Sequence, residues 1–323
     1  MRMVYKLLIF AAWAASCTLA AAQSYPGKPI RMIAPSSPGG PVDVIARVLV
    51  LGMTETLGQQ VVVENRAGAA GLIGAELVAK APADGYTLLL GFSGPLAIVP
   101  NLNDATPYDP VRDFAPVSLA ASAPYVLLVH PAVPAKSVKE LVALAKSRPG
   151  RMNYASGGNG TGIHMAGELF NLAAGVRILH VPYKGAGPGM AALLSGETDM
   201  MFNGLSPAIP QMKAGRLRGL AVGGEKRSSL MPELPTVAES GLKFNTTGWY
   251  GVLAPRGTPQ PIVARLQGEI ARGLNLSAVK EQLAKMGVEG IGSTPEQFGS
   301  LIREEVEKWG KVIKAAGLKG MSL

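Results

Sequence analysis

Short aliphatic segments alternate with longer amphipathic segments along this chain, and the alternation occurs in two separate blocks. In the first block the expected strands are residues 30–34, 61–64 and 88–92, and the expected helices are residues 42–57 and 70–80. In the second block the expected strands are residues 152–155, 178–182, 199–203 and 217–222. Crossovers of this length join parallel strands, because the chain must return to the same edge of the sheet. The pattern predicts an α/β protein with helices packed on parallel sheets.

Two unusually long extended segments, residues 114–130 and 244–254, lie on either side of the second block. The mature chain of about 300 residues exceeds what one hydrophobic core usually serves, so two domains are expected. We predict a first domain from residues 23–122 and 248–323, and a second domain from residues 123–247. The extended segments are interpreted as two crossings between the domains. Two crossings act as a hinge, so the expected architecture is two α/β domains around a central cleft.

The first residues have the pattern of a secretory signal peptide. Arg2 and Lys6 precede an apolar run at residues 7–13 that is too short to span a bilayer, and small residues follow at 19–22. We expect cleavage after Ala22 and export to the periplasm. Lipid attachment at Cys17 is the alternative processing route. No later segment is apolar enough to predict a membrane span.

Charge and cysteine content limit the functional classes. The formal net charge is +9, and the basic residues are scattered rather than clustered, which argues against nucleic acid and favours small anions. Cys17, the only cysteine, lies in the leader, so the mature chain should lack disulfides, thiolate metal sites and cysteine nucleophiles. His130, His164 and His180 lack paired spacing, and neither a metal nor a cofactor is expected. We interpret His130 and His180 as structural and leave His164 open between a structural role and a ligand contact.

Several local signals predict helix boundaries and core positions. Ser137 with Glu140, and Thr294 with Gln297, have the spacing of a capping box. Pro259 and Pro295 suit the first position of a helix. In the last helix, apolar residues at helical spacing predict that Trp309 packs in the core.

A glycine- and proline-rich turn follows the first expected strand and leads directly into a helix. Its residues are Ser36, Ser37, Pro38, Gly39, Gly40, Pro41, Val42 and Asp43. Such a turn places unpaired N–H groups and the positive end of a helix dipole at the carboxyl edge of the sheet, where an anion can bind. The alternative is that the glycines only permit a tight turn and Asp43 only caps the helix.

The second domain carries a similar turn ahead of His164. Its residues are Ser156, Gly157, Gly158, Asn159, Gly160 and Thr161. Two such turns facing one another would suit a ligand with two polar ends, held by backbone donors and short hydroxyl side chains. Tyr183 and Asn203 also end expected parallel strands, at the edge where open α/β sheets bind ligands.

The sequence contains segments similar to nucleotide-binding and hydrolase motifs, but each lacks a residue that the motif requires. Ile163 and His164 stand where a phosphate-binding loop needs Lys and Ser or Thr. Pro95 replaces the last glycine of a nucleophile elbow around Ser93. A periplasmic serine hydrolase using Ser93 or Ser156 with His164 remains the alternative function, because triads assemble from distant segments.

Four motifs in order resemble a known family. The residues are Pro38-Gly39-Gly40-Pro41-Val42-Asp43-Val44-Ile45-Ala46-Arg47, then Glu64 to Ala75, Asp84-Gly85-Tyr86-Thr87-Leu88, and Val181-Pro182-Tyr183-Lys184-Gly185. Together they resemble the Bug-type extracytoplasmic solute receptors of the tripartite tricarboxylate transporter family, over essentially the whole mature chain. The resemblance implies a type II periplasmic-binding-protein fold, no catalysis, no cofactor, and closure on a small carboxylate-bearing solute.

The resemblance also implies partners and roles for the two turns. Residues 36–43 would hold one ligand carboxylate with bridging waters, and residues 156–161 would meet the other end. A membrane transporter subunit, or in some relatives a sensor domain, would receive the closed form, which we expect to be a monomer. The sequence departs from the family pattern at Ser36-Ser37, at Val42 and at Gly94-Pro95-Leu96, beside Ser93. A di- or tricarboxylate, an aromatic acid and an amide analogue therefore all stay open as ligands.

Overall fold

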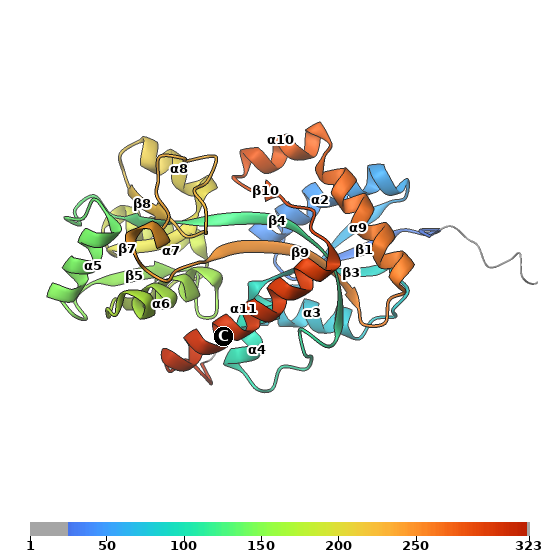
Figure 1. Ribbon diagram of the computed structural model, residues 1–323, viewed down its shortest axis with the longest axis horizontal. Helices are drawn as coiled ribbons and strands as arrows, with labels where there is room; N and C mark the ends of the chain where they lie inside the picture. The colour runs from blue at the N-terminus through green and yellow to red at the C-terminus, as the bar shows by residue number, and fades with distance from the viewer. Residues whose placement is uncertain (1–24, 322–323) are drawn as a thin grey trace, which may run out of the picture.

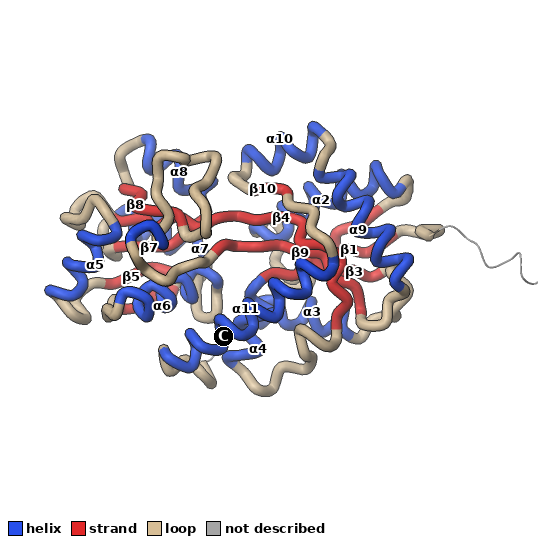
Figure 2. The backbone as a smooth tube through the Cα atoms, viewed as in Figure 1, coloured by secondary structure: helices blue, strands red, loops and turns tan. Residues whose placement is uncertain are grey.

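The structure is a computed structural model and describes residues 25–321 (Figure 1). The expected signal peptide, its cleavage after Ala22 and the alternative lipid site at Cys17 lie outside the described residues. The described chain forms two α/β halves joined by two long strands that run side by side (Figures 1 and 2). Within residues 25–321, no helix is both long enough and apolar enough to cross a bilayer.

The first half contains a parallel sheet made from the first block of the sequence. Strands β1 (Ile30–Ala34), β2 (Val61–Asn65) and β3 (Thr87–Phe92) pair in the order β2-β1-β3. Helix α2 (Pro41–Leu57) connects β1 to β2, and α3 (Leu72–Ala79) connects β2 to β3. The aliphatic residues of β1 and β3 are fully buried in consecutive runs, as expected for parallel strands that are covered on both faces.

The second half repeats this arrangement. Strands β5 (Asn153–Ser156), β6 (Leu179–Pro182) and β7 (Met200–Gly204) are parallel, with β5 between the other two. The connecting helices are α5 (Val138–Ser147), α6 (Gly162–Ala174), α7 (Ala186–Ser195) and α8 (Leu205–Lys213). Strand β8 (Arg218–Val222) follows α8 and pairs with β4 (Phe114–Val129).

The two long extended segments are strands β4 and β9 (Thr247–Pro255), which lie antiparallel to one another. Strand β4 pairs with β9 from Phe114 to Pro124, and from Tyr125 onward it pairs with β7 and β8. One strand therefore belongs to both sheets, and β9 also pairs with β3. Short strand β10 (Glu289–Gly290) pairs with β4 at Ala121 and Ser122.

The C-terminal segment contributes three helices, α9 (Gln260–Leu274), α10 (Ser277–Lys285) and α11 (Pro295–Ala315). The capping box of Thr294 with Gln297 is confirmed, as is Pro295 at the first helical position. The expectation for Pro259 is wrong by one position, because Pro259 is the N-cap and Gln260 begins the helix. Short helical turns complete the chain at η2 (Ala69–Gly71), η3 (Gly94–Ile98), α4 (Val99–Leu102) and η4 (Ala238–Ser240).

Trp309 is buried as predicted, but its surroundings extend beyond the first half. The same apolar cluster contains Leu102 from the first half, Phe170 and Phe202 from the second, and Trp309 with Ile313 from α11. Helix α11 therefore packs across both halves, and Figure 1 shows it running diagonally from the end of β9 toward α6. Burial at this position is the packing role that the periodicity indicated.

Candidate functional site

The topology gathers the candidate loops at the carboxyl edges of the two parallel sheets. In the first half these loops follow β1, β2 and β3, and they touch one another around two glycines. A Cβ atom on Gly71 would lie 3.3 Å from the Pro35 carbonyl oxygen and 3.2 Å from the Pro95 ring, and one on Gly74 would lie 2.7 Å from Pro35 Cβ. Because glycine has no Cβ atom, it lets the loop after β2 approach the neighbouring loops this closely. The three loops therefore form one continuous surface.

Asp43 holds the first loop together from inside. It is 3% exposed, and it accepts hydrogen bonds from Gly39 N–H (2.8 Å), from Asn65 Nδ2 (2.9 Å) and from Arg47. Burial alone raises the pKa of a carboxyl group, but the bonds from Arg47, Gly39 and Asn65 outweigh it and keep the pKa of Asp43 below its ordinary value. Asp43 therefore stays ionised and orients the loop from the first turn of α2.

The loop after β2 has an unusual backbone. Ala69 and Ala70 have positive φ angles of 45° and 52°, between Gly68 and Gly71, which are also positive. The expected helix at 70–80 consequently begins only at Leu72. An L-residue in this region is strained, and such strain concentrates at functional sites.

Replacing Ala70 with glycine should raise the free energy of unfolding by about 0.5–1 kcal/mol, because glycine adopts positive φ without steric cost. Urea denaturation measures the change. Exposed Ala278 in α10 provides the matched control, since Ala278→Gly should lower the free energy of unfolding by about 0.5–1 kcal/mol. A destabilised Ala70→Gly protein would contradict the strain interpretation.

The second-domain loop is closed by its own side chains. Ser156 Oγ accepts from Gly158 N–H (3.0 Å), and Thr161 Oγ1 caps α6 by accepting from His164 N–H (3.2 Å) while donating to the Gly158 carbonyl (2.8 Å). Gly160 N–H donates to His164 Nδ1 (3.2 Å). The loop is therefore a pre-formed turn at the N-terminus of a thirteen-residue helix, where an anion is favoured.

Two histidines lie directly under this loop. The rings of His164 and His180 stack with centroids 3.9 Å apart, and His180 Nε2 is 2.6 Å from Ser156 Oγ. Burial lowers the pKa of His164 to about 3, with a further contribution from His180, and burial lowers the pKa of His180 to about 4. Both rings are neutral at physiological pH. On the other side, Tyr154 Oη donates to Glu168, whose pKa is raised by burial.

These histidines make the fold sensitive to acid. Their pKa values are lower in the folded state than the ordinary 6.5, so the unfolded chain takes up protons first as pH falls. Stability should be complete above pH 6.5 and decline toward pH 4, approaching about 1.4 kcal/mol per pH unit for each histidine. The raised pKa of Glu168 acts in the opposite direction and offsets part of the loss. Urea midpoints at pH 7, 5.5 and 4.5 measure the decline, and a midpoint independent of pH would contradict it.

The structure brings some predicted site residues together and turns others inward. Ser93 lies close to the start of α6, directly after the second-domain loop, since a Cβ atom on Gly162 would lie 3.6 Å from Ser93 Oγ. Tyr183 Oη instead donates to Glu197 (2.8 Å), and Asn203 is buried with its Oδ1 accepting from Gly204 N–H. The backbone of Tyr183 still borders the loop, because its carbonyl would lie 3.1 Å from a Cβ atom on Gly158.

Two tyrosines at the site were absent from the sequence prediction. Tyr125 Oη would lie 3.3 Å from a Cβ atom on Gly248 and would overlap one on Gly162, so it sits between the connecting strands and the second-domain loop. Burial raises the pKa of Tyr250 to about 12 and also raises that of Tyr125, to which the Tyr250 hydroxyl contributes. Both are half-buried. The available sequence signal was a tyrosine within each of the two long extended segments, since a tyrosine joins an apolar ring to a polar hydroxyl.

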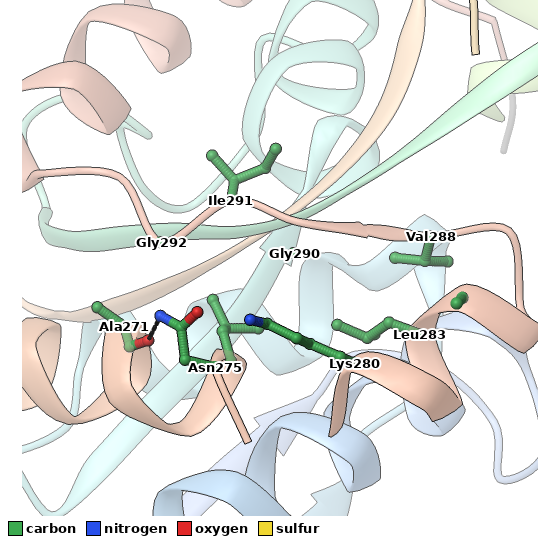
Figure 3. A pocket seen from close by; sticks show the side chains of 10 residues that line it. Ala271, Asn275, Lys280, Leu283, Val288, Gly290, Ile291 and Gly292 are labelled. Carbon is green, nitrogen blue, oxygen red and sulfur yellow. Dashed lines mark hydrogen bonds between the residues drawn. The ribbon is translucent and has the colours of Figure 1, made fainter. Parts of the chain in front are cut away.

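A separate pocket of about 280 Å³ lies between α9, α10 and the segment around β10 (Figure 3). Leu283, Val288 and Ile291 line it, and Lys280 and Asn275 reach over it. It contains none of the predicted site residues. Across residues 25–321, no group of three or more His, Cys, Asp or Glu residues is placed to hold a metal ion.

The serine hydrolase alternative fails on geometry for Ser156. Ser156 does contact a histidine, His180 rather than the expected His164, but Ser156 is 0% exposed and its hydroxyl is enclosed by the loop it supports. A nucleophile must reach its substrate.

Comparisons with known proteins agree with this geometry. The family model for the tripartite tricarboxylate transporter family receptor matches residues 45–318. Protein BugT of Bordetella pertussis is 39% identical over 320 residues, covering 98% of both chains. Among solved structures, an R. palustris protein with adipate has a TM-score of 0.79 at 36% identity, covering 91% of this chain and 98% of its own.

A second solved structure is MatC from Rhodopseudomonas palustris with bound malate, with a TM-score of 0.76 at 33% identity, covering 90% of this chain and all of its own. These relatives are solute-binding receptors and not enzymes, and they share the two-domain periplasmic-binding-protein fold expected from the sequence. The chain belongs to the tripartite tricarboxylate transporter family of receptors, the Bug-type periplasmic solute-binding proteins.

Proposed function

We propose that this receptor captures a small carboxylate-bearing solute between its two domains and delivers it to the membrane subunits of a tripartite transporter. The observation that carries the proposal is the pair of pre-formed, glycine-rich loops at the carboxyl edges of two parallel sheets, with Ser93 of the first half close to Gly162 at the start of α6 in the second. Each loop leads into the N-terminus of a helix, α2 or α6, that favours negative charge. No acid–base or nucleophilic chemistry is needed for this role.

The ligand-binding residues are proposed from the loops. They are Ser36, Ser37, Pro38, Gly39, Gly40, Pro41 and Val42 with Asp43 behind them, Ser93 and Gly94, Gly157, Gly158, Asn159, Gly160 and Thr161 with Ser156 and His164 behind them, and Tyr183 and Asn203. Adipate and malate, named with two structural relatives, are the first ligands to test. Pro95 and Leu96 offer no polar side chain beside Ser93, so aromatic acids and amide analogues belong in the same panel.

We propose residues 23–122 with 248–323 as one domain, and residues 123–247 as the other. The change of β4 partners between Pro124 and Tyr125 and the start of β9 at Thr247 support hinges near 122–125 and 245–249. A ligand that touches both loops stabilises the closed form and shifts the population toward it. Helix α11, packed across both halves, must permit that motion.

Export and assembly complete the proposal. We propose that the signal peptide is cleaved after Ala22, that the mature receptor is a monomer, and that nucleic acid is not a partner. N-terminal sequencing of protein from the periplasm should begin at Gln23. A modified cysteine at the mature N-terminus would instead establish processing at Cys17.

A thermal-shift screen of the mature protein against mono-, di- and tricarboxylates, aromatic acids and their amides tests the function. A ligand that binds only the folded state at 100 times its Kd adds about 2.7 kcal/mol of stability, and the melting temperature rises accordingly. At least one carboxylate should give a saturable shift. If none does, mass spectrometry of the denatured protein should identify a co-purified solute that already fills the site. The proposal would be contradicted if no compound shifts the melting temperature and no co-purified solute is found.

A further inference from the structure

We infer that His164 and His180 are positioning residues that fix the shape of the second ligand loop, residues 156–161, by accepting its inward-facing polar hydrogens. The inference rests on the proposed function, because it assigns the histidines to the loop that would hold the ligand. It also explains why buried His164 stacks on the half-buried ring of His180, at a position where an aliphatic side chain would pack.

The first observation is the direction of the hydrogen bonds. Gly160 N–H points into the domain and donates to His164 Nδ1 (3.2 Å), and Gly158 N–H points inward to Ser156 Oγ (3.0 Å). His180 Nε2 then holds Ser156 Oγ at 2.6 Å. Two of the loop's peptide groups are thus anchored, one directly by His164 and one through Ser156 by His180. Anchoring alternate peptide groups fixes the orientation of those between them.

The second observation is that the contact to His164 requires a neutral ring. His164 Nδ1 accepts a hydrogen bond only when it carries no proton, so the ring hydrogen lies on Nε2. That Nε2 is buried without a hydrogen-bond partner, 3.9 Å from Glu168 Oε1. A buried N–H left unpaired costs stability, so packing alone does not account for histidine at this position.

The surroundings keep the rings uncharged. Tyr154 on β5 stacks against His180 with centroids 5.0 Å apart, and its hydroxyl is committed to Glu168 on α6. Glu168 is the acidic group that faces the pair, and burial raises its pKa, which weakens its ability to draw a proton onto His164. Two imidazolium rings could not stack at 3.9 Å in this buried setting. The loop therefore keeps one shape across the neutral range and loses its anchor in acid.

Matched substitutions separate positioning from packing. In His164→Asn the side-chain oxygen takes the place of Nδ1, and in His180→Gln the side-chain oxygen takes the place of Nε2, whereas His164→Leu and His180→Leu keep bulk without an acceptor. Amide hydrogen exchange followed by nuclear magnetic resonance on the unliganded, ¹⁵N-labelled protein reports on the N–H groups of Gly160 and Gly158. Titration with adipate, malate or whichever carboxylate shifts the wild-type melting temperature reports on the ligand site.

His164→Leu should speed exchange at Gly160 about 10-fold or more, and His180→Leu should do the same at Gly158. Each should weaken carboxylate binding about 10-fold, the equivalent of one lost hydrogen bond. The asparagine and glutamine variants should remain within about 3-fold of wild type in both measurements. Folded leucine variants with unchanged exchange and affinity would overturn the inference. If a leucine variant does not fold, the wild-type protection factor of Gly160 decides, because it corrects the exchange rate for its intrinsic decrease with falling pH. This protection factor should fall as pH is lowered from 6 toward 3, where His164 takes up a proton, while the rest of the domain stays protected.

The exchange measurement needs no ligand. If the wild type binds no carboxylate but the leucine variants lose Gly160 or Gly158 protection, the proposed function fails and the positioning role stands. If binding is normal and protection never depends on the histidines, the positioning role fails and the function stands.

Discussion

Replacing Trp309 with alanine is expected to lower the free energy of unfolding by about 3–5 kcal/mol, the largest stability effect in this account. Trp309 is 2% exposed and packs in the apolar cluster that joins both halves of the molecule. Its Nε1 donates to Glu305 Oε2 (2.8 Å), which also accepts from Trp249 Nε1 (3.0 Å) at the start of β9. The substitution therefore leaves a cavity and removes one of two indole donors from a buried carboxylate.

Urea denaturation monitored by circular dichroism measures this effect. Lys314, exposed on the same helix, gives the control, and Lys314→Ala should change the free energy of unfolding by less than about 0.5 kcal/mol. A Trp309→Ala protein that loses less than about 1 kcal/mol would show that α11 does not contribute to a core shared by the two halves.

Introducing valine at Gly162 is expected to weaken carboxylate binding about 30- to 100-fold. A Cβ atom there would overlap Tyr125 Oη and lie 3.6 Å from Ser93 Oγ, so the side chain would occupy the junction between the two halves. Overpacking of a closed junction costs about 2–3 kcal/mol, which corresponds to this loss of affinity. Because Gly162 is the first residue of α6, the substitution leaves the interior of the helix unchanged.

Isothermal titration calorimetry with the carboxylate identified by the thermal-shift screen measures the affinity. Gly268→Val in α9 is the matched control, because a Cβ atom at Gly268 would meet no heavy atom within 4 Å. It should bind the ligand like wild type. An affinity within about 3-fold of wild type for folded Gly162→Val would place the ligand away from this junction.

The alternation of strands and helices in the sequence predicted much of the fold, because each buried strand and amphipathic helix carries its own period. Strand β4 was found as one long extended segment, and its end at Val129 is one residue from the prediction. The sequence could not show that β4 and β9 are antiparallel neighbours shared by both sheets. Pairing between residues so distant in the chain depends on tertiary packing rather than on local pattern.

The sequence predicted the two candidate loops but not the directions of their side chains. The glycine turns after β1 and β5 were identified from their composition, which permits the backbone shapes the loops need. The directions of Ser156, Tyr183 and Asn203 were not available from sequence, and these side chains turn inward or toward Glu197. His180 was interpreted as structural, and its contact with Ser156 could be seen only once β5 and β6 were paired.

The central claim is that one carboxylate ligand is held between two domains that close on it. Small-angle X-ray scattering of the mature protein, with and without the carboxylate that gives a saturable thermal shift, tests this claim most directly. The radius of gyration should decrease at saturating ligand, and no such decrease is expected for Gly162→Val at the same concentration. An unchanged radius of gyration for wild-type protein with the ligand fully bound would contradict it.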